Sequence, residues 1–140
     1  MCLYYSAKET AKLKRKKGSI ICKKAYIASD GKLLSPLMGN CMWALPPFQK
    51  GAVVKKAGVI QSTRKSSKLT EQERKTKEIN YGIHVYLKNE YVVPGEVCVP
   101  VKCNIKDLVG AGAKDGEYGW EAVFTKVSIS KKDFEKAIGE

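Results

Sequence analysis

An eight-residue polar segment, Gln61–Lys68, carries the side chains of this sequence best suited to hold a phosphate. It reads Q-S-T-R-K-S-S-K and combines four hydroxyl groups with three cations and no apolar side chain. Hydroxyls, an arginine fork and free loop amides are groups that bind phosphate well. The spacing G-x-x-x-x-G-K-[ST] of a P-loop is absent. The segment therefore predicts a phosphate contact, and the alternative is a solvated loop without a ligand.

The predicted site adds aromatic rings and the single histidine to this segment. Arg64 and Lys65 would clamp the phosphate, neighbouring hydroxyls would donate hydrogen bonds, and an aromatic ring would stack on a base. The histidine is expected on the polar face of a strand, where it would contact base or sugar; the alternative is a structural role. In full, the predicted ligand-binding residues are Ser62, Thr63, Arg64, Lys65, Ser66, Tyr81, His84, Tyr86 and Trp43.

Patterns that would indicate catalysis or a metal are missing from the sequence. His84 is the only histidine, and the acidic residues form no motif for metal-assisted or paired acid–base chemistry. The five cysteines are scattered, without a C-x2-C pair, and are expected to be buried, reduced thiols. We therefore expect a non-enzymatic protein that needs no metal and no cofactor.

The positive charge is concentrated in one half of the chain. The net charge is +12, and residues 1–80 hold 18 lysines and arginines against 5 acidic residues, whereas residues 81–140 hold 8 against 9. Such segregation favours an anionic partner: a nucleotide or other small anion, or alternatively DNA, RNA or an acidic protein surface. The cluster Lys12–Lys17 is explained equally well by cations at the C-terminal end of a helix.

Three runs with strand-like alternation predict the central sheet: Asn80–Leu87, Glu96–Ile105 and Glu121–Ser130. Further expected elements are helices beginning at Ser6, Thr70 and Ser130, strands Ser19–Ala28 and Lys32–Met38, and a helical turn within Lys106–Gly112. The prediction is a single α+β domain spanning residues 1–140, with a twisted, mostly antiparallel sheet and short helices at its ends or on one face.

Four sequence segments carry a resemblance to known proteins. They are M-C-L-Y-Y-S at the start, G-I-H-V-Y-L at 82–87, D-L-V-G-A-G at 107–112 and A-V-F-T-K-V at 122–127. Together they resemble a group of small, largely uncharacterised proteins met in bacteriophage and bacterial genomes. A phage origin implies a role in countering host defence. Some small phage proteins sequester nucleotide second messengers, and others bind nucleases or nucleic acid.

The expected setting is the cytoplasm, which would be that of the host cell if a phage encodes the chain. No apolar run approaches the roughly 20 residues that a membrane-spanning helix needs, and no signal-peptide pattern is present. A homo-oligomer is expected, because binding pockets commonly lie between subunits.

Overall fold

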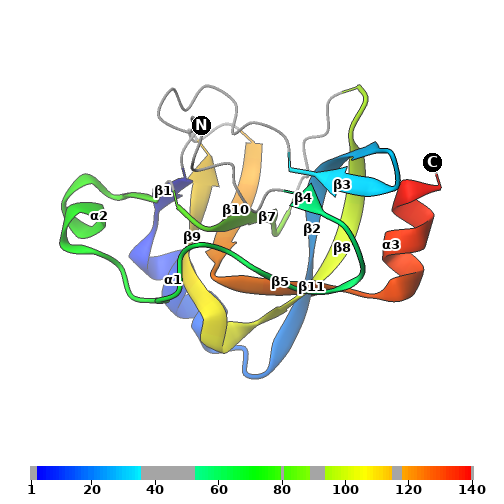
Figure 1. Cartoon of the computed structure of the whole chain (residues 1–140). Coiled ribbons are helices and arrows are strands. Elements are labelled where there is room, and N and C mark those ends of the chain that lie inside the picture. Colours follow the sequence, from blue (N-terminus) through cyan, green and yellow to red (C-terminus); the bar gives the residue numbers. More distant parts are fainter. Residues whose placement is uncertain (1–2, 36–52, 80, 89–93, 115–117, 140) are drawn as a thin grey trace.

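The computed structural model describes residues 3–35, 53–79, 81–88, 94–114 and 118–139. These residues form one strongly twisted antiparallel sheet with three short α-helices (Figure 1). The elements are β1 (Leu3–Tyr5), α1 (Ala7–Lys14), β2 (Ser19–Ser29), β3 (Lys32–Leu34), β4 (Val53–Val54), β5 (Gly58–Gln61), α2 (Glu71–Thr76), β6 (Glu78–Ile79), β7 (Ile83–Tyr86), β8 (Val97–Asn104), the 3-10 turn η1 (Ile105–Asp107), β9 (Leu108–Lys114), β10 (Tyr118–Phe124), β11 (Lys126–Ile129) and α3 (Lys131–Ile138).

The strand order is β5-β11-β8-β2-β7-β10-β9-β1-β6, and β3 and β4 continue from the far end of β2. The long strand β2 is central because it pairs with β8 through eight residues and also meets β7 and β3. A tight turn at Asp30 and Gly31, both with positive φ, joins β2 to β3. The predicted α+β architecture with a mostly antiparallel sheet is confirmed.

The main core lies inside the curve of the sheet. It is built by inward residues of β2, β7, β8, β10 and β11, and Phe134 and Ala137 of α3 close it. A second, smaller cluster, formed by Leu3, Ile79, Val109 and Val123, packs against the other face of β10. Strands β7 and β10 are therefore buried on both faces, which removes the solvent-facing side that alternation predicts for β7.

Hydroxyl side chains begin all three α-helices, as the sequence predicts. The amides of Glu9, Glu73 and Asp133 donate to the hydroxyls of Ser6, Thr70 and Ser130, respectively. Helix α1 ends at Lys14, and α2 ends at Thr76, before a left-handed Lys77.

Two predicted elements are wrong. Residues 108–112 belong to strand β9 and not to a helical turn, although η1 forms one turn just before them. The expected single strand Glu121–Ser130 is two strands, β10 and β11, which break at the buried Thr125. The Thr125 amide donates to Asp107 O, and its carbonyl accepts from the Ser62 amide, so this residue leaves the ladder of both strands.

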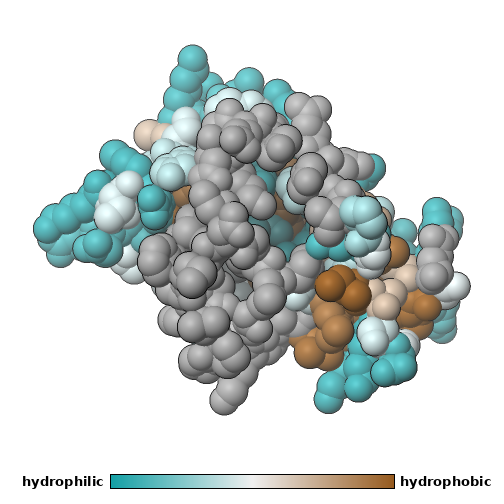
Figure 2. Space-filling view, turned by 90° about the horizontal axis from the view of Figure 1, so that it is seen from above, coloured by the Kyte–Doolittle hydropathy of each residue, from teal (hydrophilic) through white to brown (hydrophobic). Residues whose placement is uncertain are grey.

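A small apolar patch lies on the side of the molecule that carries β3 and β4 (Figure 2). Ile27, Leu34 and Val53 follow one another across β2, β3 and β4, and Ile27 and Val53 are 38% and 44% exposed. Within the described ranges, no helix has the length and apolar character needed to cross a membrane.

Candidate functional site

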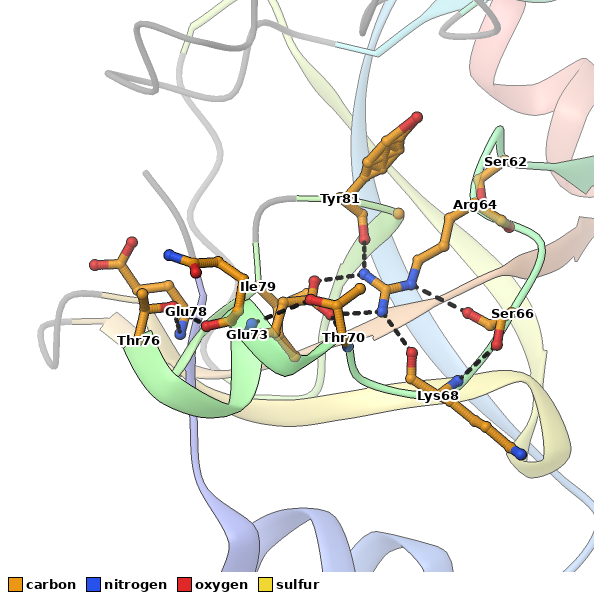
Figure 3. Close-up of polar contacts among 12 residues, drawn as sticks. Ser62, Arg64, Ser66, Lys68, Thr70, Glu73, Thr76, Glu78, Ile79 and Tyr81 are labelled. Carbon is orange, nitrogen blue, oxygen red and sulfur yellow. Dashed lines mark hydrogen bonds and ion pairs between the residues drawn. The ribbon is translucent and has the colours of Figure 1, made fainter.

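Arg64 is the centre of the polar segment, and its guanidinium is engaged inside the protein (Figure 3). Nη1 and Nη2 donate to the two carboxylate oxygens of Glu73 at 2.6 and 2.7 Å. The other donors reach three backbone carbonyls: Nε to Ser66, Nη2 to Lys68 and Nη1 to Tyr81. All five N–H groups of an arginine are thereby used.

This arrangement differs from the predicted phosphate clamp. Arg64 is 9% exposed and ties the segment to α2 and to the chain before β7. Burial opposes ionisation of Glu73, but hydrogen bonds from Arg64 and Thr70 outweigh it and lower the pKa of this carboxyl. Arg64 would hold a phosphate only if one of these bonds opened. Lys65, its neighbour, is exposed.

The predicted hydroxyl residues mostly stabilise the segment itself. Ser62 Oγ donates to Arg64 O at 2.8 Å, and Ser66 Oγ accepts from the Lys68 amide. Thr63 Oγ1 donates to the Tyr81 hydroxyl at 3.3 Å on the exposed side. The structure thus brings together Thr63 and Tyr81 as predicted neighbours. Trp43 lies outside the described residues.

His84 is buried, whereas the sequence predicts it on a polar face. It is 7% exposed, because the second apolar cluster covers that side of β7. Its ring nitrogens lie 3.3 Å from Gly82 O and 3.2 Å from Ile79 O. Burial, reinforced by the charge of Lys24, lowers the pKa of His84 to about 4. The ring is therefore neutral at pH 7 and donates to one of the two carbonyls. Tyr86, two residues on, is half-buried.

A buried lysine, absent from the predicted site, lies beside this histidine. Lys24 is 8% exposed, its Nζ donates to His84 O at 3.1 Å, and it lies 5.4 Å from the centre of the Tyr26 ring. Burial lowers the pKa of Lys24 to about 8, while the charges of Glu121 and Glu96 oppose that shift. The two carboxylates offset part of the cost of burial, so the pKa stays above 7 and Lys24 remains protonated at pH 7.

The sequence contains a signal for this cluster. In strand Ser19–Ser29, alternation places Lys24 on the same face as Cys22 and Tyr26, both of which are buried. A charged residue on an apolar strand face needs a partner of opposite charge or several hydrogen bonds. That reasoning identifies Lys24 as a buried charge. It does not identify Glu121, because only the fold brings the strand that carries Glu121 close to Lys24.

Exposed cations gather at the end of the molecule where α1 leads into β2. We call this surface the basic end; it consists of Lys12, Lys14, Arg15, Lys16, Lys17 and Lys106, all exposed. The backbone bond from the Ile105 amide to Gly18 O, 2.9 Å long, holds η1 beside the chain that follows α1. No acidic residue occurs in 12–19 or in 102–106. The half-buried Asp107 is the nearest carboxylate in sequence.

A shallow, open depression lies within the basic end. Gly18, Ser19, Asn104 and Lys106 line it, so it offers a hydroxyl, an amide and an ammonium group at the surface. Gly18 has φ +89, and a side chain there would meet open space, so the backbone is accessible at this point. Such groups can bind an anion, but none of them can stack on a base.

The described part of the chain contains neither a metal-binding cluster nor an exposed thiol among its cysteines. Within it, no group of three or more histidine, cysteine or acidic side chains could hold a metal ion. Cys22 and Cys103 are buried free thiols, as predicted, and Cys98 is half-buried. The hydrogen bond between the two buried thiols lowers the pKa of Cys22 and raises the pKa of Cys103.

Comparisons with protein-family models, with curated proteins and with solved structures give no significant match to this chain.

Proposed function

We propose that this chain is a non-catalytic binding protein for phosphate-bearing nucleotide ligands and that the basic end holds their phosphates. The single observation that carries the proposal is a run of five exposed cations between Lys12 and Lys17 that leads directly into an open polar depression at Gly18 and Ser19, where Lys106 adds a sixth. Arg64, the strongest candidate phosphate ligand by sequence, is hydrogen-bonded to Glu73. The side chains of the basic end are exposed.

The helix macrodipole does not account for this cluster. The C-terminal end of a helix carries about half a negative charge, and that effect is confined to the last turn. Only Lys12 and Lys14 lie in the last turn of α1. Lys16, Lys17 and Lys106 lie beyond it, so most of the positive charge is left for an external anion.

A nucleic-acid backbone fits this surface better than a single nucleotide. Exposed cations run from α1 to Lys17, next to the depression, and Lys106 of η1 lines it, so positive charge extends over more than one phosphate, as a chain of phosphates requires. A mononucleotide site is expected to enclose its ligand and to contact the base, and the lining of the depression offers no ring for that contact. A second messenger built from several nucleotides is compatible with the same surface. Countering a host defence, the role implied by the resemblance, would require binding and no turnover.

Fluorescence anisotropy with a labelled oligonucleotide tests the proposal. We expect salt-dependent binding with a slope of log K against log salt of about −3, corresponding to roughly four contacted phosphates. Replacing Lys14, Lys16 and Lys17 together by glutamine should weaken binding at least tenfold and flatten the slope by about 2.

A variant with the same loss of charge at another place is the matched control. Lys131, Lys132 and Lys136 are exposed on α3, so replacing them by glutamine lowers the net charge equally. This control should retain affinity. Equal losses in the two variants would mean that net charge alone drives binding, and unchanged affinity in the first would remove the basic end from the function.

A further inference from the structure

The outer face of the sheet carries two strongly exposed aliphatic side chains in one row. Ile21 of β2 is paired with Lys102 of β8, Lys102 with Ser128 of β11, and Ser128 with Val59 of β5. Residues directly opposite on antiparallel strands point to the same face. Ile21 and Val59 are each 69% exposed. We call these four residues the outer row.

The outer row continues the basic end without interruption. Ser19 and Asn104, which line the depression, are themselves a cross-strand pair. They lie two residues before Ile21 and two residues after Lys102, which places them on the same face at a distance of about 7 Å along the strands. Lys126 lies two residues before Ser128 and adds another cation to this face.

We propose that the outer row makes this protein a binder of single-stranded nucleic acid. Ile21 and Val59 would pack against unstacked bases, while Lys102 and the basic end contact the phosphates. This inference rests on the proposed function, because it needs phosphates at the basic end.

The chemistry of the face selects a single strand over a duplex. A duplex presents phosphates and groove edges, and its base faces are stacked inside, so exposed aliphatic side chains on an open sheet face gain nothing from it. In a single strand the apolar base faces are available, and burying them against Ile21 and Val59 removes apolar surface from water on both sides. The cation between the two aliphatics is placed where the backbone of such a strand would pass.

The experiment compares an oligothymidylate and an oligouridylate of about 16 nucleotides with a duplex of the same length. The double variant Ile21→Ser/Val59→Ser should bind the single strands about five- to tenfold more weakly, with an unchanged salt slope, because the phosphate contacts remain. Lys102→Gln should reduce the slope for a single strand by about 0.7. The double variant Ile27→Ser/Val53→Ser alters exposed aliphatics of the apolar patch near β3 and β4 and should leave affinity unchanged.

Wild-type affinity of the Ile21→Ser/Val59→Ser variant, or equal or tighter binding of the duplex, would overturn this inference and leave the proposed function intact. Failure of the proposed function is distinct. It would show as unchanged affinity for every probe when Lys14, Lys16 and Lys17 are neutralised, or as no nucleic-acid binding alongside capture of an acidic protein.

Discussion

Arg64 and Glu73 form a two-bond ion pair, with Nη1 to Oε2 at 2.6 Å and Nη2 to Oε1 at 2.7 Å, and both side chains are largely buried. The same Glu73 Oε1 accepts from the Thr70 amide and completes the capping box of α2. One carboxylate therefore joins the start of a helix to a segment rich in hydroxyls. This pair makes the 61–70 region an ordered part of the fold.

Arg64→Ala should destabilise the fold by about 3 kcal/mol, because it leaves the buried Glu73 carboxylate without its cation. Arg64→Lys should restore only part of the loss, since an ammonium group cannot reproduce five donors in a plane. Urea denaturation followed by circular dichroism measures both. Lys65→Ala, an exposed neighbour, is the control and should change stability by less than about 0.5 kcal/mol. A large loss of ligand affinity with unchanged stability in Arg64→Ala would instead restore the phosphate clamp that the sequence predicts.

His84 should titrate with a pKa near 4, well below its ordinary value, because burial and the charge of Lys24 disfavour the imidazolium. As the chain has one histidine, a single imidazole resonance reports this pKa by NMR. A titration midpoint near 6.5 would show that the ring is solvated, contrary to the structure.

The same shift makes stability depend on pH. Between pH 6.5 and about 4 the unfolded chain binds a proton at His84 that the folded chain does not, so stability falls as pH falls. The loss of stability is absent well above pH 6.5 and amounts to about 3 kcal/mol once the pH has fallen to the folded-state pKa. In His84→Gln this component should vanish, so its stability should fall less steeply with acid. Parallel curves for the two proteins would exclude His84 as the titrating group.

Local signals in the sequence predict much of this fold. Ser6, Thr70 and Ser130 mark the helix starts, and the alternation around Val99, Val101 and Cys103 identifies the inner face of β8. Each of these signals depends on neighbours within a few residues. Strand order does not, because pairs such as Leu3 with Ile79 join distant segments whose register is decided by packing.

The candidate site was harder to predict, because composition does not reveal which polar side chains are already engaged. Arg64 and Lys65 are adjacent in a cationic segment, yet one is buried in an ion pair and the other is exposed. His84 has the alternation of a half-exposed strand, but the cluster around Leu3 and Val109 covers it. Only the tertiary contacts separate these cases.

The buried cluster around Lys24 predicts a strong coupling with Glu121. Lys24→Met removes the positive charge near the buried Glu121 carboxylate and should cost about 3 kcal/mol at pH 7. Adding Glu121→Gln should recover part of that loss, giving a coupling energy of at least about 1 kcal/mol in a double-mutant cycle. Lys32→Met changes an exposed lysine of β3 and should cost less than about 0.5 kcal/mol. Additive losses would mean that the two charges stabilise the fold independently.

Gly112 allows β1 and β9 to pair, because a Cβ atom there would lie 1.8 Å from Tyr4 O and 2.8 Å from Tyr4 C. Both contacts are with backbone, so no side-chain rotation relieves them. Gly112→Ala should therefore cost about 3 kcal/mol or more, or abolish folding. Gly95→Ala is a matched control: its new methyl group meets nothing within 4 Å, and only the positive φ of +93 adds strain, so the expected cost is about 1 kcal/mol. Thermal melts and urea curves of the two variants give the comparison. Equal, small losses in stability would show that β1 can shift away from β9 at little cost. The second apolar cluster contains Leu3 of β1, so that result would also mean that this cluster is loosely packed.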